Sequence, residues 1–115
     1  MQRFITIIAI IFVVILSTLI SSPVLADSTN DLTSGAKIFE ANCAGCHAQG
    51  GNIVRRGKNL KIKALEKNKV DTQEAIAELV TNGKNNMSAY KDKLTAKEIA
   101  DVSAYVLQKA EQNWR

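Results

Sequence analysis

The sequence contains few of the residue types from which most functional sites are built. It has one histidine and two cysteines, and aromatic residues make up 5% of the chain. Three Cys and His residues in total are too few for a structural zinc site, which takes four ligands. The scarcity of aromatic side chains argues against nucleic-acid binding, in which bases stack on aromatic rings. Pro23 is the sole proline, so no later residue interrupts a helix in this way.

A long hydrophobic run occurs at the start of the chain. Arg3 supplies a positive charge, Phe4–Ile20 is almost entirely apolar, and Val24-Leu25-Ala26 places residues that signal peptidase accepts at the expected cleavage site. This pattern predicts a secretory signal peptide, residues 1–26, that is cleaved after Ala26. An uncleaved membrane anchor is the alternative, because the run is nearly long enough to cross a bilayer. After cleavage, residues 27–115 are expected to form one small domain without stable membrane insertion.

Helical patterns dominate the rest of the sequence. Apolar residues recur every three or four positions, and no segment alternates at period two as a strand would. Thr95 and Glu98 form a capping box, and Gly83 suits the left-handed end of a helix. Thr33 or Ser34 is expected to cap the first helix. The sequence therefore predicts an all-α domain with helices at Leu32–Asn42, at Leu60–Lys67, from Asp71 or Thr72 to Asn82 and from Thr95 onward, and with a loop at Ala48–Lys58.

Both cysteines and the histidine lie in one motif, Cys43-Ala44-Gly45-Cys46-His47. Two thiols at this spacing can add to the two vinyl groups of one haem, and the histidine that follows then ligates the iron. This attachment takes place outside the cytoplasm in bacteria, in agreement with the predicted signal peptide. A large apolar macrocycle also supplies core volume that a small domain lacks. The motif therefore predicts covalent attachment of haem.

Three other interpretations use the same residues less completely. A zinc site lacks its fourth ligand. A thioredoxin-like redox pair would follow a strand, and no strand pattern precedes Cys43. A disulfide between Cys43 and Cys46 would close a very small loop, and it leaves His47 without a role.

Met87 is the sole methionine after the predicted cleavage site, since Met1 leaves with the signal peptide. It lies in the polar segment TNGKNNMSAY between two expected helices, where a core methionine would be out of place. Elimination therefore indicates Met87 as the second axial ligand, opposite His47. An iron with both axial positions filled transfers electrons and does little chemistry on bound substrates. A lysine, Tyr90 or the amino terminus is an alternative ligand.

The segments that carry these features resemble the cytochrome c6 family, the soluble electron carriers of cyanobacteria and algae. The likeness covers nearly all of the chain after the signal segment, in GAKIFEANCAGCHA, GGNIVRRGKNL, ALEKN, VTNGKNNM, IADVSAYVLQKA and the terminal NWR. It implies the small cytochrome c fold, with about four helices wrapped around one covalently attached haem c. The residue roles that it implies are thioether attachment for Cys43 and Cys46, axial ligation for His47 and Met87, haem-pocket lining for Asn52, Lys58, Leu60 and Leu79, and helix packing for Gly35, Phe39 and Tyr105.

The resemblance also implies a function and partners. It indicates a non-enzymatic, mainly monomeric one-electron carrier from cytochrome f of the b6f complex to photosystem I. The expected compartment is the thylakoid lumen, with the periplasm as the alternative, and a terminal oxidase is a further expected acceptor. A haem sensor or enzyme with an open iron is a competing hypothesis, which requires displacement of Met87.

Three positions depart from the family pattern. Ser88 follows Met87 where members usually have proline, and loss of the rigid φ softens the ligand loop. Leu79 stands where members that donate to photosystem I have glutamine, which indicates a lower-potential cytochrome c6-like paralogue with a different redox partner. Asp92-Lys93 replaces a Gly-Arg pair associated with docking, and lysine lacks the planar guanidinium of arginine.

Positive charge is concentrated in one segment. The chain has a formal net charge of +4, and Arg55–Lys69 holds seven Lys and Arg residues against the single Glu66. This segment is either an ordinary solvated surface or a patch that steers an acidic partner. Ile53 and Val54 directly precede it and are expected to form an apolar rim for brief docking.

Overall fold

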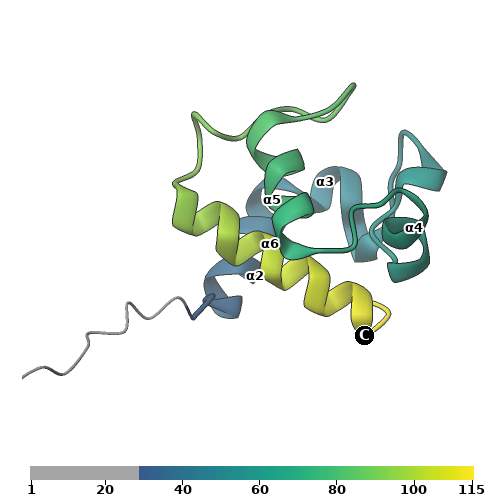
Figure 1. The fold of residues 1–115 in the computed structure, drawn as a ribbon, viewed down its shortest axis with the longest axis horizontal. Helices are drawn as coiled ribbons and strands as arrows, with labels where there is room; N and C mark the ends of the chain where they lie inside the picture. Colours follow the sequence, from purple (N-terminus) through teal and green to yellow (C-terminus); the bar gives the residue numbers. More distant parts are fainter. Residues whose placement is uncertain (1–28) are drawn as a thin grey trace, which may run out of the picture.

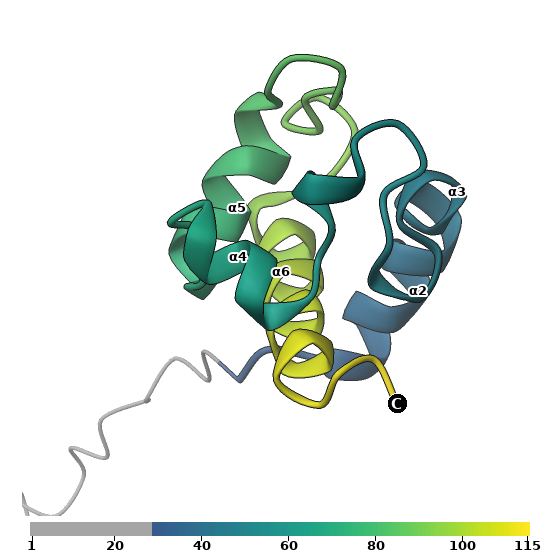
Figure 2. The ribbon, with the colours of Figure 1, turned by 90° about the vertical axis from the view of Figure 1, so that its right-hand side faces the viewer.

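The computed structural model describes residues 29–115, so the predicted signal peptide lies outside the described residues. Figure 1 shows this part of the chain as a set of helices joined by loops. Figure 2 shows α2 and α3 on one side and α4 and α5 on the other, with α6 between them. The elements in chain order are α2 (Leu32–Asn42), α3 (Ala44–His47), the 3₁₀ turns η1 (Ala48–Gly50) and η2 (Arg56–Lys58), α4 (Ile62–Lys67), α5 (Gln73–Asn82) and α6 (Ala96–Glu111).

The predicted all-α class is confirmed, with small differences at the helix ends. Helix α2 has the predicted bounds, but the predicted cap at Thr33 or Ser34 is wrong. Asp31 caps α2 instead, because its carboxylate accepts hydrogen bonds from the amides of both of those residues. The predicted capping box of Thr95 and Glu98 is present at the start of α6. Helix α4 starts two residues later than predicted, and the predicted loop at 48–58 contains η1 and η2.

Helices α2 and α6 pack closely where Gly35 meets Asp101. A Cβ on Gly35 would lie 2.3 Å from the carbonyl oxygen of Asp101, so only a residue without a side chain fits here. One helical turn further along, the Phe39 and Tyr105 rings are 5.6 Å apart. These contacts confirm the packing roles that the family resemblance implied for Gly35, Phe39 and Tyr105.

The hydrophobic core is formed by α2, α4, α5 and α6. Its buried apolar residues come from all four helices, which fixes α4 and α5 relative to the α2–α6 pair. The core consists of Phe39, Leu65, Ile76, Val80, Ile99, Val102, Val106 and Ala110. No helix within residues 29–115 is both long enough and apolar enough to cross a membrane.

Candidate functional site

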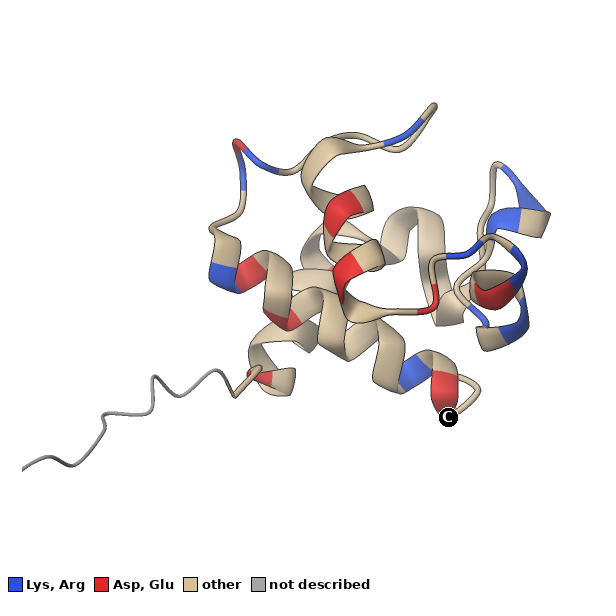
Figure 3. Ribbon diagram, viewed as in Figure 1, with Lys and Arg blue, Asp and Glu red and all other residues tan. Residues whose placement is uncertain are grey.

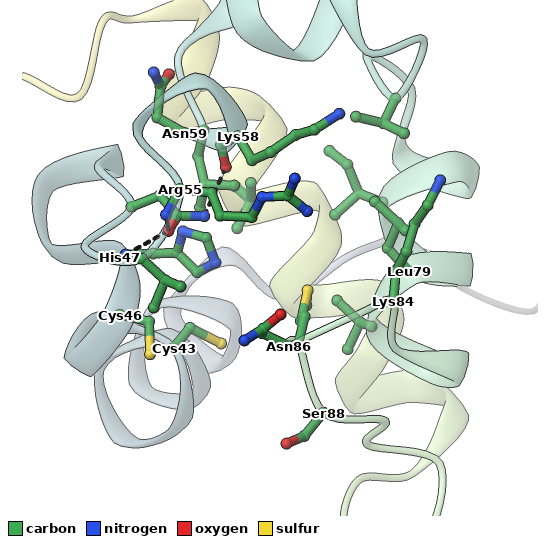
Figure 4. Close-up of a pocket in the computed structure, with 18 of the residues that line it drawn as sticks. Cys43, Cys46, His47, Arg55, Lys58, Asn59, Leu79, Lys84, Asn86 and Ser88 are labelled. Atoms are coloured by element: carbon green, nitrogen blue, oxygen red, sulfur yellow. Dashed lines mark hydrogen bonds between the residues drawn. The ribbon is translucent and has the colours of Figure 1, made fainter.

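One cavity of about 280 Å³ collects all of the predicted site residues. Figure 4 shows Cys43, Cys46 and His47 on one side of this cavity and Leu79 and Lys84 on the other. The interior wall is apolar and is formed mainly by core residues. The lining residues include the predicted set Cys43, Cys46, His47, Asn52, Lys58, Leu60, Leu79 and Met87, together with Phe39, Leu65, Val70, Ile76, Val80, Val102 and Val106.

The helical turn α3 presents the cysteines and the histidine together. The amides of Cys46 and His47 both donate to the carbonyl of Cys43, at 3.1 and 2.9 Å. Positions i, i+3 and i+4 of a helix share one face, so all three side chains reach the same cavity. The two thiols are not joined in a disulfide.

The environment of Cys43 does not suit a redox-active thiol. Burial, reinforced by the neighbouring Cys46, raises the pKa of the Cys43 thiol to about 11. A catalytic thiol pair depends on a lowered pKa, because the thiolate is the nucleophile. A thioredoxin-like redox pair is therefore not supported, because helix α2 and not a strand precedes Cys43, and because the pKa of the Cys43 thiol is raised and not lowered.

The imidazole of His47 is held in one tautomer. Its Nδ1 lies 2.8 Å from the carbonyl oxygen of Gly51. Because a carbonyl oxygen can only accept, Nδ1 must carry the proton, which leaves the Nε2 lone pair free to bind a metal. This arrangement orients and strengthens an imidazole ligand.

Met87 lies half-buried in the loop between α5 and α6. The amides and carbonyls of Lys84 and Met87 pair with each other at 3.0 Å in both directions, which closes the loop. Gly83 has a φ of +68°, and a Cβ at this position would lie 2.5 Å from the Met87 carbonyl oxygen. The loop therefore requires glycine at position 83 for both its conformation and its space.

Asn52 shapes the mouth of the cavity on the histidine side. Its side-chain oxygen accepts from the amides of Val54 and Arg55, at 2.9 and 2.7 Å. Its side-chain nitrogen donates to the carbonyl of Lys58 at 3.0 Å. The ammonium group of Lys58 in turn donates to the side-chain oxygen of Asn68, which also lines the cavity.

Some contributors to the site could not be identified from their residue type. Gly51 acts through its backbone carbonyl, and the glycine pair after the CxxCH motif was the sole sequence signal of such a close approach. Tyr90, which the sequence offered as an alternative ligand, donates its hydroxyl to the Asn42 carbonyl at 3.0 Å and connects the Met87 loop to the end of α2. Burial raises the pKa of Tyr90, and the nearby Cys43 and Cys46 raise it further. Arg55 also lines the cavity, although the sequence indicated it only as part of the basic segment.

The residues present fit a covalently bound haem. The cavity offers two free thiols, an imidazole with an unprotonated nitrogen and a thioether sulfur, within walls that are largely apolar. Such a donor set matches His/Met ligation of a c-type haem.

Comparisons with known proteins identify the family. Residues 30–106 match the family model described as cytochrome C oxidase, cbb3-type, subunit III, a range that includes the CxxCH motif and Met87. A "cytochrome c6-like" protein from Nostoc sp. is 52% identical over 115 residues, which is 100% of both chains. A "cytochrome c6" from Nostoc sp. is 54% identical over 96 residues, 83% of each chain.

Solved structures agree with this assignment. Cytochrome c6C from Synechococcus sp. has a TM-score of 0.67 at 64% identity, covering 69% of this chain and 96% of that one. Cytochrome c6 from the diatom Phaeodactylum tricornutum has a TM-score of 0.71 at 44% identity, covering 73% and 99%. The chain belongs to the cytochrome c6 family, whose members are electron carriers that bind one covalently attached haem c.

Proposed function

We propose that this chain is a one-electron carrier whose haem is bound by the CxxCH motif and Met87. The observation that carries the proposal is the cavity in which both thiols, the one histidine of the chain and Met87 meet. In this proposal Cys43 and Cys46 form the two thioethers, and His47 and Met87 are the axial ligands.

Each part of the site has a role in this proposal. The bound haem supplies the Fe(III)/Fe(II) couple. The Gly51 carbonyl keeps His47 Nδ1 protonated, so that Nε2 is presented as a neutral ligand. The backbone pairing of Lys84 with Met87 holds the thioether loop closed, and the apolar walls exclude water. With His47 and Met87 both holding the iron, no coordination position would remain for a substrate, which supports a carrier and not an enzyme.

The mouth of the cavity is the proposed docking surface. Val54 lines the cavity, and the Ile53 and Val54 side chains are 73% and 59% exposed. Figure 3 shows Lys and Arg residues gathered around η2 and α4. Arg55 and Lys58 of this group also line the cavity. An exposed apolar contact with a basic surround suits short-lived docking on an acidic protein surface.

Salt dependence tests this docking surface. Replacement of both Arg55 and Arg56 by glutamine should slow electron transfer with an acidic partner and flatten its ionic-strength dependence. Lys37→Gln is the matched control, because Lys37 is exposed on α2, outside the basic segment. Equal rates for the variants at low salt would contradict the steering role.

We assign cytochrome f of the b6f complex as the electron donor and photosystem I as the acceptor, in the thylakoid lumen or periplasm. A terminal oxidase is the proposed additional acceptor. Support comes from the full-length likeness to proteins named cytochrome c6 or cytochrome c6-like.

A second candidate function is that of a lower-potential c6-like carrier with a different redox partner. The observation that favours it is the position of Leu79 in the cavity wall. The family resemblance implies glutamine at this position in donors to photosystem I. The 52% identity to a cytochrome c6-like protein and the 64% identity to cytochrome c6C also support it.

Two measurements test these proposals. The mass of the exported protein must exceed that of the polypeptide by one haem, and a bare-polypeptide mass would contradict both candidates. A redox titration then separates them. A potential equal to that of photosystem I donors, with fast oxidation by photosystem I, supports the shuttle role, whereas a clearly lower potential with slow oxidation supports the c6-like role.

A further inference from the structure

The chain reverses direction after α6 and places Trp114 against the histidine loop. Asn113 and Trp114 have φ values of +53° and +58°, which are uncommon for residues other than glycine. The Trp114 amide donates to the Lys109 carbonyl at 2.7 Å, which closes this turn. Such a conformation persists where surrounding contacts hold it in place.

The indole of Trp114 packs between α2, α6 and the loop after His47. Its ring lies 5.1 Å from the Phe39 ring and 6.4 Å, edge-on, from the Tyr105 ring. A Cβ on Gly50 would lie 2.3 Å from the indole nitrogen, and Gly50 has a φ of +75°. The loop therefore approaches the indole as closely as its backbone allows.

A short series of hydrogen bonds connects the indole to the imidazole. Trp114 Nε1–H donates to the Leu60 carbonyl at 2.9 Å, and the Leu60 amide donates to the Gly50 carbonyl at 2.7 Å. The next residue, Gly51, supplies the carbonyl that accepts from His47 Nδ1 at 2.8 Å. Both backbone groups of Leu60 are therefore hydrogen-bonded. Its carbonyl accepts from Trp114, and its amide donates to the loop that orients His47.

We propose that Trp114 is a positioning residue for His47. Its indole holds the segment from Gly50 to Leu60 in place, so that the Gly51 carbonyl stays directed at Nδ1 and the imidazole keeps one ring orientation. The inference rests on the proposed role of His47 as an axial ligand. It predicts that Trp114, which lies outside the haem cavity, controls the orientation of the His47 ring.

The test compares two conservative variants of the same aromatic cluster in the haem-loaded protein. Trp114→Phe keeps a ring against Phe39 and removes the indole N–H that donates to the Leu60 carbonyl. Tyr105→Phe is the matched control, because it alters the same cluster and leaves the Trp114–Leu60 bond in place. In the reduced protein, exchange of the His47 Nδ1 proton with solvent should become about tenfold faster in Trp114→Phe, as expected from the loss of one net hydrogen bond.

A second readout follows the orientation of the imidazole. The haem-methyl NMR shifts of the oxidised protein depend on the plane of the axial imidazole, so they should change in Trp114→Phe and stay unchanged in Tyr105→Phe. Equal exchange rates and equal shifts in the two variants would overturn the proposal. A wild-type protein without His47 ligation would instead overturn the proposed function, so the two failures are distinguishable.

The wild-type protein alone provides a further test if Trp114→Phe does not fold. The Leu60 amide and the His47 Nδ1 proton should open to exchange together, with the same dependence on low concentrations of denaturant. Protection of the histidine proton after the Leu60 amide has opened would show that the loop does not depend on this connection, and it would overturn the proposal.

Discussion

The carboxylate of Asp101 accepts a hydrogen bond from the backbone amide of Asp31 at 2.9 Å, across 70 positions of sequence. This bond joins the cap of α2 to the buried face of α6, where Asp101 is 2% exposed. The same carboxylate pairs with Lys97 at 3.0 Å. One buried charge therefore connects the two helices whose crossing positions the rest of the fold.

Asp101 makes the stability of the protein sensitive to acid. Burial by itself would raise the pKa of this carboxyl, but the Asp31 amide, Lys97 and the Ser34 side chain together outweigh burial and lower the pKa. A lowered pKa in the folded state means that this stabilisation is present above the unfolded value of about 3.9 and is lost as the pH falls through the folded value. Asp101→Asn should cost about 1–3 kcal/mol at neutral pH and weaken the acid dependence. Urea unfolding across this pH range measures both effects.

The Lys97 side chain provides the control for this prediction. It is 65% exposed, so Lys97→Ala should cost less than about 1 kcal/mol. If Asp101→Asn lost stability in acid as steeply as the wild type, another carboxylate would be responsible for the effect.

Gly35→Ala should destabilise the crossing of α2 and α6. The added methyl group would meet the Asp101 backbone oxygen at 2.3 Å, and backbone cannot move aside as a flexible side chain does. The expected cost is about 2–3 kcal/mol, measured as a lower urea midpoint. Gly45→Ala is the matched control, since no atom lies within 4 Å of its added Cβ and alanine favours the helical turn. A lower midpoint for Gly45→Ala than for Gly35→Ala would refute this account.

Leu79→Gln should raise the redox potential of the haem protein. It introduces a polar group into the apolar wall of the cavity, on the side opposite the CxxCH motif. A side-chain amide that favours the reduced form by one net hydrogen bond shifts a one-electron couple by about 40 mV. Leu79→Met, which changes shape without adding a hydrogen-bonding amide, is the control. An unchanged potential in both variants would show that the polarity of this wall does not tune the site.

Met87→Ala should open the iron to external ligands. The oxidised variant should lose the weak far-red absorption band of a thioether-bound ferric haem, and the reduced variant should bind carbon monoxide readily. Ser88→Pro should strengthen the Met87 ligation. A fixed φ lowers the conformational entropy of the open loop, which stabilises the closed loop by about 0.4–1 kcal/mol. Binding of added imidazole to the ferric haem protein measures both changes, because it should become tighter in Met87→Ala and weaker in Ser88→Pro. Retention of the far-red band in Met87→Ala would exclude Met87 as the ligand.

Local sequence features were sufficient for most of the helices and for the chemistry of the site. The bounds of α2, the capping box at Thr95 and the spacing of the CxxCH motif depend on residues a few positions apart. Interactions over this short range can be predicted from the order of the residues alone. The cap of α2 was predicted wrongly because Asp31, Thr33 and Ser34 are all good capping residues, and the bond to Asp101 favours Asp31.

The sequence by itself determined the helical class, the haem-binding motif and the two candidate axial ligands. Tertiary structure alone decided that Gly51 presents its carbonyl to His47, that Trp114 packs on Gly50, and that Leu79 and Met87 share a cavity with the CxxCH motif. These contacts join residues that are far apart in the chain or act through the backbone. Which residues meet in these contacts depends on the path of the folded chain, and the types of the residues do not determine that path.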